Sequence, residues 1–161
     1  MNLLPRSNIF EAGTASAAAL FENHVEGIGE NGSCIVLALS QQPLEAVAQN
    51  AIEKSLSALG YGQDICTYAT LLPHNAGESE IELDPQALFL LVEGLDPLCV
   101  IAADAAATQA LGRAYRTEFA LDSPIRVFGR PAVSFRDLTS LLTTNDGKQR
   151  AWRIFKGIPK R

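Results

Sequence analysis

The stretch LDPLCVIAADAAATQALGRAY, residues 95–115, indicates the fold class. Its apolar run over 98–103 is typical of a short strand buried on both faces. Asp104 follows at once, and an alanine-rich run then predicts a helix that ends at Gly112. In open α/β folds, ligands bind at the carboxyl ends of parallel strands, where Asp104 stands. Asp104 is therefore either a ligand-binding carboxylate or a helix N-cap, and we favour the N-cap.

The same alternation of strand and helix extends over most of the chain. Four apolar runs predict strands at 34–39, 64–70, 98–103 and 131–134. Between them, spacings of three and four predict helices at 43–59, with Pro43 in the first turn, and from the cap Asp84 to about Val92. Two short β pieces surround Gly129, and a helix near 145–157 carries Trp152 and Phe155 as its anchors. The prediction is a three-layer α/β/α domain with a central, mainly parallel sheet of about four strands.

The first 33 residues are only weakly patterned. Thr14 or Ser16 is a suitable cap for a helix through residue 25, and GIGENGS then predicts a turn. We therefore expect residues 1–33 to form a helical segment and turn packed on a single domain at 34–161.

Composition and cysteine usage restrict the class of protein. The 161 residues are 47% hydrophobic and 19% charged, which is typical of a globular chain. No apolar run approaches the roughly 18–20 residues that span a bilayer, and no signal peptide is evident, so we expect a cytoplasmic protein. Cys34, Cys66 and Cys99 each lie in an apolar run and form no CxxC pair. They are predicted to be small buried hydrophobes, with no disulfide, metal site or cofactor.

Charge is distributed unevenly along the chain. Residues 1–104 carry 14 acidic and 2 basic side chains, whereas residues 105–161 carry 4 acidic and 11 basic ones. Such asymmetry indicates either a nucleic-acid or partner-binding face, or a solvated basic helix that pairs with the acidic half. The rest of the protein surface is strongly acidic and repels phosphate, so at most weak, non-specific nucleic-acid binding is expected. The candidate partner-binding residues are Lys148, Arg150, Arg153 and Lys156.

Five segments together carry a resemblance to a known family. They are CIVLALSQQP (34–43), IEKSLSALGYGQDICTYATLLP (52–73), LDPLCVIAADAAATQALG (95–112), IRVFGRPAVSF (125–135) and KQRAWRIFKGI (148–158). In their order and spacing they resemble the uracil-DNA glycosylase superfamily, especially a bacterial branch with a Gly-Glu-Ala-Pro-Gly motif. The resemblance covers about residues 34–157. It implies a glycosylase-like fold and a bacterial protein of DNA repair or replication, in a family that extrudes a base and hydrolyses its N-glycosidic bond.

The resemblance places a cleft at the ends of the strands, but the motif residues differ. Gln41 stands where that branch has Glu, and a Gln cannot act as a general base. Ala69 or Thr70 stands where the family reads uracil with Asn, and Ser134–Asp137 lacks the His-Pro of the late motif. His24 and His74 fall outside the expected sites and are interpreted as surface histidines. The implied cleft residues are Ser40, Gln41, Gln42, Pro43, Thr70, Asp104, Ser134, Phe135 and Arg136.

A second, shorter resemblance suggests how such a fold functions without catalytic groups. Residues 136–158, RDLTSLLTTNDGKQRAWRIFKGI, look like the late pattern of the psi subunits of the bacterial DNA polymerase III clamp loader. Those subunits are similar to the glycosylases in fold and join partner proteins. The first hypothesis is therefore a non-catalytic interaction module. The alternative is a divergent DNA glycosylase or other nucleotide-acting enzyme that uses Gln41, Asp104, Arg136 and Asp137.

Overall fold

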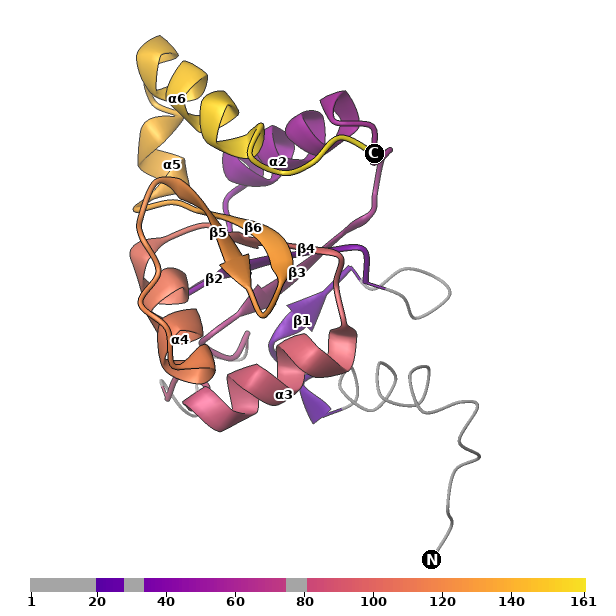
Figure 1. Ribbon diagram of the computed structural model, residues 1–161, viewed down its shortest axis with the longest axis vertical. Coiled ribbons are helices and arrows are strands. Elements are labelled where there is room, and N and C mark those ends of the chain that lie inside the picture. The colour runs from indigo at the N-terminus through magenta and orange to yellow at the C-terminus, as the bar shows by residue number, and fades with distance from the viewer. Residues whose placement is uncertain (1–19, 28–33, 75–80) are drawn as a thin grey trace, which may run out of the picture.

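The computed structural model describes residues 20–27, 34–74 and 81–161, and it shows a mixed α/β fold built on one six-stranded sheet (Figure 1). The apolar runs of the sequence supply its central strands. The strands are β1 (Val25–Glu26), β2 (Val36–Ser40), β3 (Cys66–Thr70), β4 (Cys99–Ala102), β5 (Ser123–Val127) and β6 (Arg130–Ser134).

Parallel strands form the middle of the sheet, in the order β1-β3-β2-β4-β6-β5. The neighbours β3 and β2, β2 and β4, and β4 and β6 are parallel, whereas β1 and β5 pair antiparallel at the two edges. The sheet is thus mixed and has two strands more than the four predicted. β1 was missed because two residues are too few to show a period.

The segment before β2 corrects one expectation. Val25–Glu26 is an edge strand in register with Ala69 and Tyr68, where the sequence predicted the end of a helix. The amide of Thr70 also donates to the carbonyl of His24. Pairing with β3 therefore prevails over the local helix signal. The rest of the prediction for residues 1–33 falls largely on 1–19 and 28–33, which lie outside the described residues.

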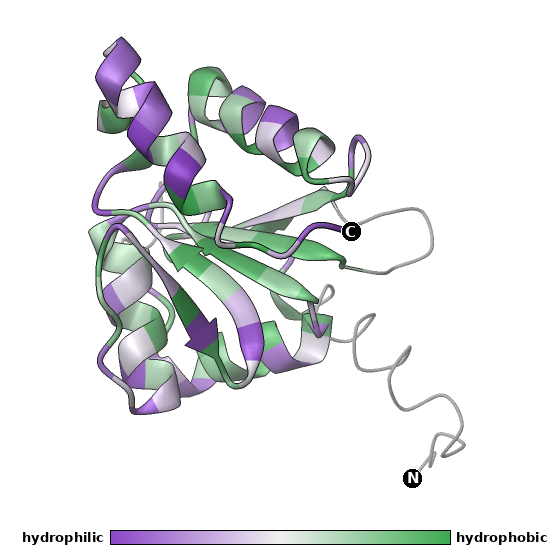
Figure 2. Cartoon of the chain, turned by 45° about the horizontal axis from the view of Figure 1, so that its top comes forward, coloured by the Kyte–Doolittle hydropathy of each residue, from purple (hydrophilic) through white to green (hydrophobic). Residues whose placement is uncertain are grey.

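Helices lie on both faces of the sheet. α2, α5 and α6 lie on one side, and α3 and α4 lie on the other (Figure 1). β2 supplies both cores because its side chains alternate: Leu37 and Leu39 join one apolar cluster, and Val36 and Ala38 join the other. Figure 2 shows the central strands as an apolar layer between helices that carry polar residues on their outer faces. The helices are α2 (Ala46–Ala58), α3 (Pro85–Leu95), α4 (Ala105–Tyr115), α5 (Leu138–Leu141) and α6 (Asn145–Phe155).

Side-chain caps fix where most of these helices begin. Asp84, Asp104, Asp137 and Thr144 each accept a hydrogen bond from the backbone amide three residues later. The predicted start at Asp84 is confirmed. α2 begins later than predicted, at Ala46, with no side-chain cap, because residues 41–45 continue as an extended turn. α4 continues past Gly112 to Tyr115, where Arg116 adopts the left-handed conformation.

A two-residue turn joins β5 to β6 and confirms the two β pieces expected around Gly129. Phe128 and Gly129 have φ of 53° and 86°, the pair of positive values that a tight hairpin of this twist requires. Glycine adopts this conformation without strain, whereas an aromatic residue at Phe128 is unusual there.

The cysteines lie where the sequence predicted. Cys34, Cys66 and Cys99 are buried, and all three thiols are free. Within the described ranges, none of the helices has both the length and the apolar character needed to cross a membrane.

Candidate functional site

The topology brings most of the predicted cleft residues to one edge of the sheet. Ser40 and Thr70 pair at the carboxyl ends of β2 and β3, and Ser134 pairs with Ala102 at the ends of β6 and β4. Asp104 follows β4 by two residues. The sequence therefore placed these groups on a common edge correctly, and their chemistry depends on which atoms remain available there.

The hydroxyl groups of this edge bond to nearby backbone carbonyls. Ser40 Oγ donates to Gln42 O at 2.6 Å, and Thr70 Oγ1 donates to Leu72 O at 2.6 Å. Ser134 Oγ donates to the carbonyls of residues 120 and 123. All three hydroxyl residues are buried. Phe135, predicted as a cleft residue, is instead a core residue whose ring packs 5.0 Å from that of Phe155, measured between centroids.

Asp104 uses both of its carboxylate oxygens within the fold. Oδ1 accepts from the amide of Ala107 at 2.8 Å, which caps α4 as predicted. Oδ2 accepts from the amide of Gln41 at 2.9 Å. Asp104 also forms an isolated antiparallel bridge with Asp137. One side chain therefore ties the turn after β2 to the start of α4.

Gln41 is similarly held in place. Its side-chain Nε2 donates to Glu82 Oε1 at 2.7 Å, and its carbonyl accepts from the amide of Leu72 at 3.1 Å. Together with the amide bond to Asp104, these contacts connect Gln41 to three other segments. Gln42 and Pro43, the next residues of the predicted motif, are exposed.

Arg136 and Asp137 lie beside a pocket of about 400 Å³. Asp137 Oδ1 accepts from the amide of Ser140, and Oδ2 accepts from its hydroxyl at 2.8 Å, so this carboxylate caps α5. The backbone of Arg136 is fixed on both sides: its amide donates to Asp122 Oδ1 and its carbonyl accepts from Ala105. Its side chain is exposed, next to Asp122 and Arg150 in the pocket wall.

The two histidines differ from their interpretation as surface residues. His24 and His74 are half-buried, and both lie close to the carboxyl end of β3. His24 Nδ1 is 2.9 Å from Thr70 O, and the amide of His74 donates to Asn23 O. His74 Nδ1 lies 3.7 Å from Glu26 Oε1. The sequence missed this placement because the antiparallel pairing of β1 brings His24 to β3.

Three of the four predicted basic residues lie on α6, and Lys156 is its C-cap. Lys148, Arg150, Arg153 and Lys156 are all exposed. Of the two predicted anchors of α6, Phe155 is buried in the core. Trp152 is half-buried: it packs against the edge of the core cluster and also lines a groove.

That groove runs between α2 and α6 and is the α2–α6 groove of the sections below. Its volume is about 510 Å³. Leu142, Ala151 and Phe155, all buried, form its floor. Its sides and rim contain both apolar and basic residues: Val47, Asn50, Ala51, Lys54, Ser55, Lys148 and Trp152.

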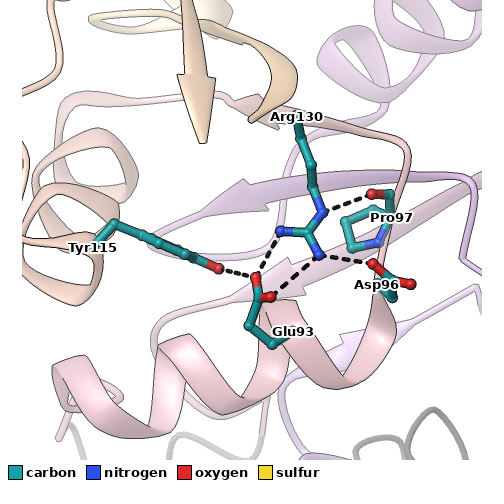
Figure 3. Close-up of polar contacts among 5 residues, drawn as sticks. All are labelled: Glu93, Asp96, Pro97, Tyr115 and Arg130. Carbon is teal, nitrogen blue, oxygen red and sulfur yellow. Dashed lines mark hydrogen bonds and ion pairs between the residues drawn. The ribbon is translucent and has the colours of Figure 1, made fainter. Parts of the chain in front are cut away.

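A separate polar cluster around Arg130 lies on the opposite side of the sheet (Figure 3). The guanidinium donates to Glu93 Oε2 at 2.6 Å, to Asp96 Oδ1 at 2.7 Å and to the carbonyl of Pro97 at 2.9 Å. Burial lowers the pKa of Arg130, but these acidic partners raise it above its ordinary value overall. Burial and the hydrogen bond to Glu93 raise the pKa of Tyr115. The sequence did not predict this cluster, because its members are far apart along the chain.

Comparison with protein-family models gave no match, and comparison with curated proteins gave no significant match.

Proposed function

We propose that this protein is a non-catalytic interaction module, built on a fold similar to the uracil-DNA glycosylases and linked to DNA replication or repair. The order of the elements and the mixed α/β class are compatible with that fold. The shorter resemblance of residues 136–158 to psi subunits supports a role in joining proteins.

One observation carries the proposal. Both oxygens of Asp104 accept backbone amides, so this carboxylate is engaged in holding α4 and the turn after β2. A general base needs a free lone pair within hydrogen-bond reach of a water or substrate proton. The carboxylate keeps further lone pairs, but these two hydrogen bonds fix its orientation along the backbone of α4 and of the turn after β2, which supports a structural role.

The other polar groups of the carboxyl edge support the same conclusion. The Gln41 side chain cannot act as a base, and its side-chain amide donates a hydrogen bond to Glu82. Asp137 is a helix cap. Of the four candidate catalytic side chains, only that of Arg136 is exposed without a hydrogen bond among the described residues, and a guanidinium alone supplies no base.

The proposal is tested by assaying uracil release from single- and double-stranded DNA, with an active glycosylase as the positive control. We expect no release by this protein, and no change in the Gln41→Ala or Arg136→Ala variants. Release by the wild-type chain that either substitution abolishes would contradict the proposal. That result would establish the alternative, a divergent glycosylase acting at this edge.

A further inference from the structure

We infer that the α2–α6 groove binds an acidic amphipathic helix of a partner protein, an inference that rests on the proposed function. The groove is lined mainly by residues of α2 and α6, two helices on the same side of the sheet (Figure 1). It differs from the carboxyl edge in combining an apolar floor with basic residues at its rim.

The interior of the groove is suited to apolar side chains. Ala151, Phe155 and Leu142 close its floor, and Trp152 forms part of one wall. Val47 on the α2 side has 47% of its surface exposed. Water on such a surface is displaced favourably by apolar groups. A helix that places one apolar face into a groove between two helices makes contacts of this kind.

The charge of the rim specifies the chemistry of the partner. Lys54 on α2 and Lys148 on α6 line the groove and are exposed. The ion pairs among the described residues involve His74 and Arg130, and neither lysine takes part in one. Glu or Asp residues flanking an apolar stripe would complement both lysines. Such complementarity favours the correct partner and accelerates its encounter.

Nucleic acid fits the same groove less well. Base stacking needs a free aromatic face, but Trp152 packs against the core cluster and the Lys156 ammonium lies 5.9 Å from its ring centroid. The groove floor is apolar and carries no donor for a base edge. The net charge of −5 opposes the approach of any acidic ligand, so binding depends on apolar contacts in the groove, which a helix with an apolar face supplies and a sugar-phosphate backbone does not. A protein segment is therefore the favoured occupant.

Trp152 provides the measurement, because it is the only tryptophan of the chain. The probe is a synthetic peptide of about 15 residues, with leucines spaced as i, i+3, i+4 and i+7 and glutamates at most other positions. We expect a saturable change in Trp152 emission, and heat of binding by calorimetry. The double variant Lys54→Glu, Lys148→Glu should bind roughly tenfold more weakly or worse, because two attractive charges become repulsive.

Two further variants separate the groove from the rest of the surface. Val47→Glu places a charge on the apolar wall and should weaken peptide binding by at least about tenfold. Leu90→Glu is the matched control, because Leu90 is an exposed apolar residue of α3, 54% exposed, on the other side of the sheet. It should leave peptide affinity unchanged.

Several results would overturn the inference. These are no response to the peptide by either method, an equal response to a scrambled peptide of the same composition, or tighter binding to an oligothymidine. Concentration-dependent dimerisation that masks the groove would identify a second copy of the chain as its occupant instead. None of these results bears on uracil release, so failure of this inference and failure of the non-catalytic proposal are distinguishable.

Discussion

At the scale of one residue, the Asp104 carboxylate has a structural role at a position where the sequence also allowed ligand binding. Its two carboxylate oxygens join the first turn of α4 to the backbone of Gln41. Hydrogen bonds to a charged acceptor contribute more to stability than neutral ones. Its removal should therefore affect the whole edge of the sheet and not only one helix terminus.

We expect Asp104→Ala to lower the free energy of unfolding by about 2 kcal/mol, because it removes a cap and leaves the Gln41 amide without its acceptor. Urea denaturation measures this loss. The control is Asp84→Ala, which removes a single exposed cap from α3 and should cost about 1 kcal/mol. An Asp104→Ala protein as stable as the wild type would show that these bonds are not important for stability.

Cys34 gives a second prediction at this scale, through pH. Burial raises the pKa of its thiol from 9.0 to about 11. The folded state therefore retains a proton that the unfolded chain releases, so the stabilisation is complete below pH 9 and is lost as pH rises toward 11. A shift of this size corresponds to about 2 to 3 kcal/mol. Urea midpoints measured from pH 8 to 11 should fall, and Cys34→Ala should flatten the decline. An identical slope in the variant would contradict this assignment.

At the scale of elements, the junction between α5 and α6 positions the basic helix. Gly147 lies in the first turn of α6, and its amide donates to the Thr144 hydroxyl at 2.9 Å. A Cβ atom at this position would overlap the carbonyl group of Leu141. The close approach of the two helices therefore requires glycine, although glycine is a poor helix former.

Gly147→Ala should consequently destabilise the protein by about 2 kcal/mol or more, although Ala raises helix propensity elsewhere. Thermal or urea unfolding measures the effect, and the emission of Trp152 reports whether α6 has moved. The matched control is Gln149→Ala, a neighbouring exposed position of the same helix, which should change stability little. A stabilised Gly147→Ala protein would mean that α6 is not packed as described.

At the scale of the whole molecule, local patterns predicted the parts that depend on neighbouring residues. The apolar runs that become β2, β3, β4 and β6 and the cap at Asp104 all lie within short windows. β1, the Arg130 cluster and the α2–α6 groove were not predicted. Each depends on contacts between segments far apart in the sequence, such as Val25 with Ala69 and Arg130 with Glu93.

The candidate site shows the same division. Parallel topology placed Ser40, Thr70 and Asp104 on one edge, as residue order alone suggested. The hydrogen-bond partners at this edge could not be predicted from the sequence, because they come from distant segments. Asp104 accepts from the Gln41 amide, and the Gln41 side chain donates to Glu82. Whether a polar residue is available for chemistry depends on these distant partners more than on its own identity.

We propose that the carboxyl edge of the sheet maintains the structure and performs no base excision. The most direct test is a single-turnover assay, with the wild-type protein in large excess over a uracil-containing single-stranded oligonucleotide. We expect uracil release no greater than in the protein-free control. Release above that control, lost in both Gln41→Ala and Arg136→Ala proteins that remain folded, would contradict it.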